Sequence, residues 1–152
     1  MSMRPLAAML GIALWVGCIG SDSGLSEADA ASLEDRAKRY ATNLRWGRVQ
    51  EAAELVHPDD RVDFVRFMRE SQGLVRFTSF EVDSAEADRE QSTGVAIVTF
   101  RLYRPPRMDE QLLVESQDWV FDSDRKQWLL QTPDLSAYRG DVSSRESVLP
   151  KP

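Results

Sequence analysis

The chain has 152 residues, of which 42% are hydrophobic and 29% charged, a composition typical of one folded domain with a single core. Its formal net charge of −6 repels phosphate backbones, so we expect no nucleic-acid partner. Cys18 is the only cysteine and His57 the only histidine, which excludes an internal disulfide and a histidine-rich metal site.

The N-terminal residues 1–17, MSMRPLAAMLGIALWVG, predict an export signal. Arg4 supplies the positive charge, and the apolar run that follows has the length of a signal peptide but is too short to span a bilayer. Residues 15–18, WVGC, resemble the lipobox of bacterial lipoproteins. The resemblance implies that a diacylglyceryl group is attached to the Cys18 thiol, that the leader is cut before Cys18, and that the new amine is acylated. The alternative is a plain signal peptide with an incidental cysteine.

The resemblance also implies a location. In lipoproteins an aspartate after the cysteine favours retention in the inner membrane, and here Ile19 stands in that place. We therefore expect a protein that is anchored by acyl chains such as palmitate in the outer membrane of a bacterial envelope and faces the periplasm. Residues 18–25 are rich in glycine and serine and are expected to form a lipid-anchored tether.

Three helices are predicted next, over residues 27–46, 49–56 and 61–71. In the first, apolar side chains recur at spacings of three and four, and Ser26 provides an N-cap. Gly47 is the stop signal for this helix. His57 precedes a proline and ends the second helix. Asp59 or Asp60 is expected to cap the third.

Four strands are predicted after the helices, over residues 74–87, 95–103, 112–121 and 128–132, because apolar, β-branched and aromatic runs alternate there with turn-rich breaks. A change of parity in the first strand predicts a bulge near Thr78 and Ser79. The predicted fold class is α+β, with three helices packed on a curved four-stranded antiparallel sheet over residues 26–132. From Pro133 to Pro152 the chain is polar, and we expect a loosely ordered tail.

The third strand mixes apolar and polar residues on one face. Leu113, Trp119 and Phe121 share parity with Glu115 and Gln117. Such a face lines a cavity more readily than it fills a dry core, although a partly exposed sheet face explains the pattern equally well.

Two stretches, RYATNLRWGRVQEAAELVHPD (39–59) and DWVFDSDRKQWLLQTPDL (118–135), resemble the nuclear transport factor two-like superfamily, which includes SnoaL-like proteins. A long helix, a Trp-Gly hinge, an Ala-rich second helix and a final hairpin between two tryptophans recur there. The resemblance implies a cone-shaped, cystatin-like α+β fold and homodimer formation through the sheet face. The superfamily contains isomerases, dehydratases, cyclases and non-enzymatic domains, so the fold does not fix an activity.

Four residues are candidates for lining a pocket in such a cone: Tyr40, Trp46, His57 and Trp119. Tyr40 and Trp119 are more often core residues at such positions. His57 beside Asp59 and Asp60 is a possible proton-transfer pair, but closing a helix at the surface is the better explanation.

The arginines around Tyr103 are candidates for an anion site: Arg101, Arg104 and Arg107. Cations on an edge strand also prevent unwanted strand pairing, and that is their commoner role.

No catalytic residue set, nucleophile motif, phosphate loop or cofactor motif is recognisable in the sequence. We therefore expect an envelope lipoprotein whose domain binds a protein partner or assists an assembly without catalysis. The alternative is a small-molecule binder or an isomerase- or dehydratase-like enzyme that uses the cone interior. A third possibility is a rigid spacer that presents its tail.

Overall fold

The computed structural model of the chain describes residues 25–131 and 133–139. The expected export signal, Cys18 and the chain after Arg139 lie outside the described residues. The predicted α+β class and the four-stranded antiparallel sheet are both confirmed.

Three helices come first: α1 (Glu27–Arg45), α2 (Val49–Ala53) and α3 (Arg61–Glu70). Ser26 is the N-cap of α1, as predicted, and its hydroxyl oxygen accepts a hydrogen bond from the backbone N–H of Asp29. Gly47 follows the helix with a φ of +64°, a left-handed conformation in which glycine carries no steric cost. The predicted periodicity of α1 therefore corresponds to its buried stripe, formed by Leu33, Ala37, Tyr40, Ala41 and Leu44.

The second helix is shorter than expected. It ends at Ala53 instead of Val56, because the segment that follows pairs with the edge of the sheet. The backbone N–H of Leu130 donates to the carbonyl of Leu55, and the N–H of His57 donates to the carbonyl of Leu130. Sheet pairing thus satisfies backbone groups that a longer helix would have used.

The sheet has the strand order β1-β2-β3-β4 and is antiparallel throughout. The strands are β1 (Arg76–Asp88), β2 (Thr93–Tyr103), β3 (Gln111–Asp122) and β4 (Gln127–Gln131). Their ends lie within two residues of the predicted ones, which is the usual uncertainty of strand boundaries. β4 pairs only with the second half of β3, so the first half of β3 has no strand neighbour on that side within the described residues.

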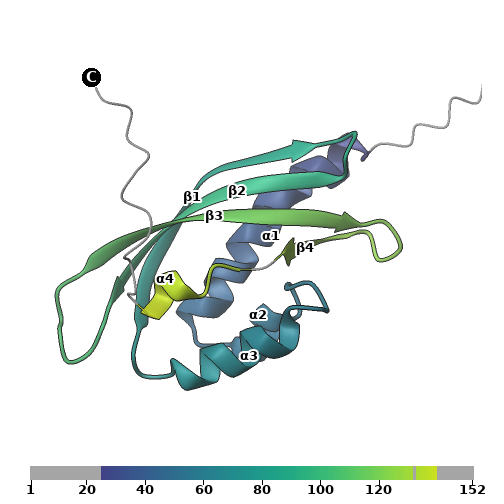
Figure 1. The fold of residues 1–152 in the computed structure, drawn as a ribbon. Coiled ribbons are helices and arrows are strands. Elements are labelled where there is room, and N and C mark those ends of the chain that lie inside the picture. Colours follow the sequence, from purple (N-terminus) through teal and green to yellow (C-terminus); the bar gives the residue numbers. More distant parts are fainter. Residues whose placement is uncertain (1–24, 132, 140–152) are drawn as a thin grey trace, which may run out of the picture.

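Two register shifts bend the long hairpin of β1 and β2. One lies between Phe77 and Ser79, as the sequence predicts, and a second lies between Val82 and Ser84. Each bulge adds a residue to one strand and increases the local twist. The sheet therefore curves, and α1 lies along its concave side with α2 and α3 beside one end (Figure 1).

Both ends of the described chain are fixed to the sheet. Leu25, expected as the last tether residue, is buried, and it exchanges two hydrogen bonds with Arg89. At the other end, residues 136–139 form the short helix α4 (Ser136–Arg139), which carries the buried side chain of Tyr138. The expectation of a loosely ordered chain from Pro133 onward is therefore wrong for residues 133–139, because an aromatic side chain in the polar tail fills part of the core.

Candidate functional site

The concave face of the sheet carries the mixed side chains that the parity of β3 predicts. Glu115, Gln117, Trp119 and Phe121 are all buried, whereas the alternate residue Val114 is 64% exposed on the outer face. The polar residues of this parity therefore face the helices rather than solvent. They lie in the part of a cone fold where a ligand could be enclosed.

Glu115 is the centre of a buried polar cluster. The hydroxyl of Tyr138 donates to its two carboxylate oxygens at 2.9 and 3.0 Å, and the side-chain amide of Gln117 donates to one of them at 2.9 Å. Burial raises the pKa of Glu115 from 4.5 to about 7, and the two hydrogen bonds oppose this increase because they favour the charged form. Glu115 therefore exchanges its proton near neutral pH.

Two tyrosine hydroxyls complete the cluster. Those of Tyr40 and Tyr138 lie 3.5 Å apart, and burial raises the pKa of both side chains well above the usual value of 10. Both phenols therefore stay protonated, and the hydroxyl of Tyr138 donates to Glu115. The Oε1 atom of Gln117 and the indole N–H of Trp119 are buried and have no hydrogen-bond partner among the described residues.

Aromatic side chains fill the space around this cluster. The ring of Tyr138 packs edge-on against Phe77 at 5.4 Å and Phe100 at 6.4 Å between centroids. Tyr40 packs edge-on against Trp119 at 6.3 Å. A depression of about 290 Å³ beside β3 is lined in part by Glu115, which is 4% exposed. The interior thus contains an ionisable carboxyl group that is packed closely among aromatic side chains.

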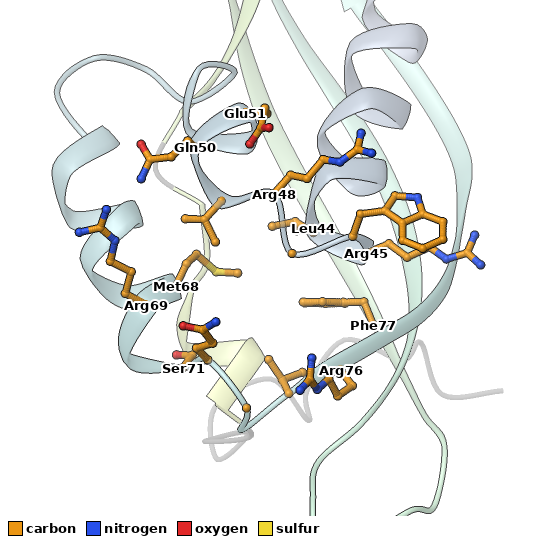
Figure 2. A pocket seen from close by; sticks show the side chains of 16 residues that line it. Leu44, Arg45, Arg48, Gln50, Glu51, Met68, Arg69, Ser71, Arg76 and Phe77 are labelled. Carbon is orange, nitrogen blue, oxygen red and sulfur yellow. The ribbon is translucent and has the colours of Figure 1, made fainter.

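A larger pocket, of about 740 Å³, opens where α1 and α2 meet the end of α3 and the start of β1. This volume is in the range of small-molecule sites. Figure 2 shows Leu44, Met68 and Phe77 pointing into the pocket from three different elements. Its inner wall is apolar, and Phe77 connects it to the interior ring packing.

The rim of this pocket is cationic. It includes four arginines and one glutamate, Glu51, and the arginines are Arg45, Arg48, Arg69 and Arg76. Within the described residues none of the four guanidinium groups forms an ion pair or a side-chain hydrogen bond, and Arg45 lies over the ring of Trp46 at 5.2 Å. A cationic rim on a chain with a net charge of −6 is a local concentration of positive charge.

Ser71 adds a polar group to the pocket wall. It is 2% exposed, and its hydroxyl oxygen has no hydrogen-bond partner in the described chain. An unpaired buried hydroxyl is unfavourable, and such groups deserve an explanation. A ligand in the pocket would supply the missing partner.

The four candidate pocket residues of the sequence analysis are found in three different environments. Tyr40 and Trp119 are core residues beside Glu115. Trp46 is 62% exposed and lines the open pocket. His57 is half-buried after α2, away from both sites.

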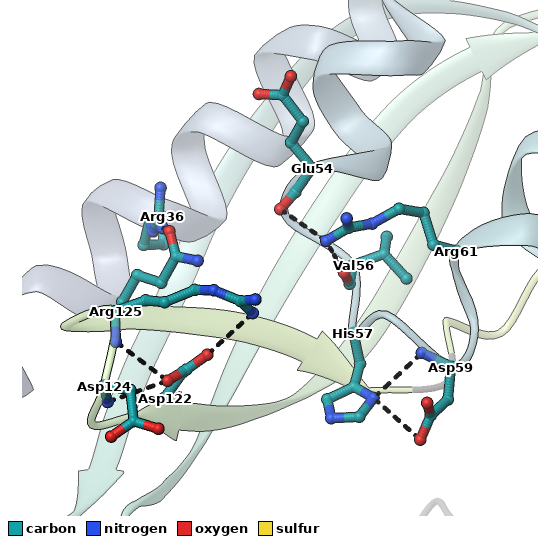
Figure 3. A network of polar contacts seen from close by, with 10 residues as sticks. Arg36, Glu54, Val56, His57, Asp59, Arg61, Asp122, Asp124 and Arg125 are labelled. Atoms are coloured by element: carbon teal, nitrogen blue, oxygen red, sulfur yellow. Dashed lines mark hydrogen bonds and ion pairs between the residues drawn. The ribbon is translucent and has the colours of Figure 1, made fainter.

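The side-chain contacts of His57 are local. Its Nδ1 atom lies 3.4 Å from the backbone nitrogen of Asp59 and 3.6 Å from a carboxylate oxygen of the same residue, which is largely exposed (Figure 3). Asp60 is the N-cap of α3, and its side chain makes no capping hydrogen bond. The guanidinium of Arg61 instead donates to the carbonyls of Glu54 and Val56, which closes the turn after α2.

The arginines of the strand break do not form one anion site. Arg101 pairs with Glu110 at 3.3 Å, and Arg104 donates to Gln111 and to the backbone carbonyl of Ala137. Arg104 thus fixes α4 to the break between β2 and β3. Within residues 25–131 and 133–139, no group of three His, Cys, Asp or Glu side chains is placed to hold a metal ion. None of the helices in these residues has the length and apolarity needed to cross a membrane.

Sequence reasoning missed two features. Tyr138 lies in a segment whose polar composition indicates disorder, and only its aromatic side chain could have signalled a core contact. The arginine rim comes from four segments, and no local pattern connects Arg45 and Arg48 with Arg69 and Arg76. The Trp-Gly hinge at Trp46 was the one available signal for this corner.

No protein-family profile and no curated protein matches the chain. Solved structures do match the chain, at low sequence identity. A SEC-C motif containing protein from Rhodopseudomonas palustris superposes with a TM-score of 0.51 and 16% identity, over 69% of this chain and 87% of that one. An LEH-like epoxide hydrolase from M. tuberculosis gives 0.50 and 14%, over 72% and 88%. The intermembrane space region of the chloroplast protein ARC6 gives 0.46 and 11%, over 68% and 92%.

Identities this low show a shared fold and leave activity open. The hydrolase has the nuclear transport factor two-like cone, and the chain described here has the same α+β cone. The fold expected from the two sequence stretches is therefore confirmed.

Proposed function

We propose that this protein is a lipoprotein of the bacterial envelope, anchored through Cys18, whose cone domain acts by binding and not by catalysis. The packing of Tyr138 is the observation that supports a binding role over a catalytic one. Its ring fills the interior beside Glu115, where a catalytic acid or base would need space for a substrate. A larger volume, of about 740 Å³ against about 290 Å³ beside Glu115, is found at the arginine-rimmed pocket.

The anchor rests on the WVGC stretch after a short apolar run. Each buried methylene contributes about 0.8 kcal/mol to membrane attachment, so one acyl chain holds a protein only marginally. Three chains on Cys18 would make attachment effectively permanent. Leu25 begins the described domain, and residues 18–24 would then connect it to the membrane.

Replacing the anchor residue tests this proposal. Cys18→Ala should abolish metabolic labelling by palmitate and move the protein from the membrane fraction to the soluble fraction. The domain should stay folded, because Cys18 lies outside the core formed by the described residues, which begin at Leu25. Labelling and membrane partitioning that do not change in this variant would contradict the anchor.

A second copy of the chain is the partner that the outer sheet face fits best. Apolar side chains are exposed there on neighbouring strands, with Val95 on β2 and Leu112 and Val114 on β3. Exposed apolar residues grouped on one face favour association. Sheet-face homodimers also recur in proteins with this cone, which supports the same partner.

The alternative function is an enzyme or small-molecule binder that uses the interior. The pKa of Glu115, near 7, favours this alternative because general acids and bases operate best near the ambient pH. Glu115→Gln separates the two possibilities in a strain that lacks the protein. An enzyme would lose complementation, whereas a binding domain would keep it because glutamine has the same shape.

A further inference from the structure

The arginine-rimmed pocket is defined by Leu44, Arg48, Met68, Ser71, Arg76 and Phe77, among the residues that line it. Its wall includes Leu44, Met68 and Phe77, its rim carries four arginines and one glutamate, and the hydroxyl of Ser71 in its wall has no partner within the described chain. We infer that this pocket binds a small organic anion with an apolar body, such as a medium-chain carboxylate. The inference rests on the proposed binding function and names its ligand class.

Only two of the four rim arginines stand where a positive charge stabilises a helix. Arg45 and Arg69 lie in the last turns of α1 and α3, where cations stabilise the helix dipole. Arg48 is the N-cap of α2, where a cation is unfavourable, and Arg76 begins β1. Arg48 and Arg76 therefore have no helix-stabilising role, and a ligand's negative charge accounts for both.

The apolar part of the ligand follows from the walls. Leu44 and Met68 are buried in the core, and Phe77 packs on Phe100 at 5.2 Å, so these walls are rigid. The apolar surface that remains accessible belongs mainly to Trp46 and to the half-buried Val49 and Phe77. An inorganic anion would leave this surface in contact with water, whereas an alkyl or aryl group would cover it and gain about 25 cal/mol per Å² of apolar surface removed from water. The hydroxyl of Ser71 can donate a hydrogen bond to a carboxylate oxygen, which would then be its hydrogen-bond partner.

The position of the pocket separates it from the proposed anchor. Residues 18–24 would lead from the membrane into the N-terminal end of α1, and the pocket is lined by residues at the other end of this helix, Leu44 and Arg45. A helix rises about 1.5 Å per residue, so the 19 residues of α1 place these ends roughly 28 Å apart. The pocket therefore lies at the end of α1 opposite to the one that the proposed tether would join.

The test uses the full chain with Cys18→Ala, so that no attached lipid competes. Three probes of equal chain length are titrated: octanoate, octanol and octylammonium. We expect octanoate to bind most tightly and to shift the backbone amide signals of Gly47 and Gly73, which line the pocket. Arg48→Gln and Arg76→Gln should each weaken octanoate binding roughly tenfold, as expected for the loss of a hydrogen bond to a charged group.

Two further variants sharpen the test. Arg125→Gln is the charge-matched control, because Arg125 lies in the β3–β4 turn and pairs with Asp122. It should leave octanoate binding unchanged. Ser71→Ala should weaken binding without lowering the melting temperature, because the hydroxyl it removes has no partner in the described chain.

Several results would overturn the ligand class: no octanoate binding, equal binding of octanol, binding of inorganic phosphate as tight as that of octanoate, or shifted amides that lie away from Gly47 and Gly73. If octanoate fails while Cys18→Ala still releases the protein from membranes, the ligand class is wrong and the anchor stands. If octanoate binds while that variant stays in the membrane fraction, the anchor is wrong and the ligand class stands.

Discussion

The hydroxyl of Tyr138 donates to both carboxylate oxygens of Glu115, at 2.9 and 3.0 Å, inside a closed core. One residue comes from the last described helix, and the other from the middle of β3. This contact fixes the C-terminal segment onto the sheet and buries an ionisable group. The stability of the domain, the change of that stability with pH and the packing of the interior therefore all depend on this one pair of residues.

Glu115 should make the stability of the domain fall as the pH rises through neutrality. Because burial raises its pKa from 4.5 to about 7, the folded chain holds a proton that the unfolded chain has already released between these values. The free energy of unfolding should therefore decrease between pH 5 and pH 8, by about 3 kcal/mol relative to Glu115→Gln. Urea denaturation at both pH values measures this difference. If the free energy of unfolding changed with pH in the same way in both proteins, this prediction would be wrong. Glu81→Gln is the control, because Glu81 is exposed on β1.

Tyr138→Phe should destabilise the domain more at pH 8 than at pH 5. Phenylalanine keeps the ring contacts with Phe77 and Phe100 but removes the donor that the ionised Glu115 carboxylate needs. The expected cost at pH 8 is about 1–3 kcal/mol. The pKa of Glu115 should also rise above its wild-type value, which carboxyl carbon NMR detects. An unchanged carboxyl titration would show that the hydrogen bond does not form in solution.

Gly94→Ala should destabilise the junction of sheet and helix. A Cβ atom there would lie 2.5 Å from a methyl group of Leu33 and 3.1 Å from the backbone oxygen of Glu86. Overpacking of this kind costs about 1–3 kcal/mol. The melting temperature of Gly94→Ala measures the effect, and combining it with Leu33→Val should recover part of the loss. Full additivity of the two substitutions would mean that the clash is absent.

Val114→Lys should prevent association through the outer sheet face. Val114 is 64% exposed and has no role in the core, so the variant should fold normally. A charge at the centre of an isologous interface meets its own copy, and like charges repel. Light scattering after size-exclusion chromatography should report a dimer for the wild type and a monomer for the variant. A wild-type monomer at all concentrations would exclude this partner. Val62→Lys is the matched control, because Val62 is 68% exposed on α3 and does not belong to the sheet face.

The sequence predicted much of the fold because its signals are local. The stripe of α1, the stop at Gly47 and the bulge after Phe77 each follow from a few neighbouring residues. The inward parity of Glu115 and Gln117 is also local, since alternate residues of a strand share a face. These features needed no knowledge of which segments meet in space.

The parts of the site that the sequence could not predict depend on contacts between distant segments. Tyr138 reaches Glu115 across 23 residues and Tyr40 across 98, and the polar segment around it suggested disorder. The shortened α2 has the same kind of cause, because pairing of residues 55–57 with β4 competes with helix formation. The arginine rim likewise forms only when the ends of α1 and α3 come together with the starts of α2 and β1.

The central claim, that a cleaved and lipidated Cys18 anchors a binding domain, is tested most directly by intact mass spectrometry of the protein purified from membranes of its own cells. The account predicts a chain that begins at Cys18, with a mass increased by a diacylglyceryl group and an N-linked acyl chain. A chain that retains residues 1–17 or carries a free thiol at Cys18 would contradict it.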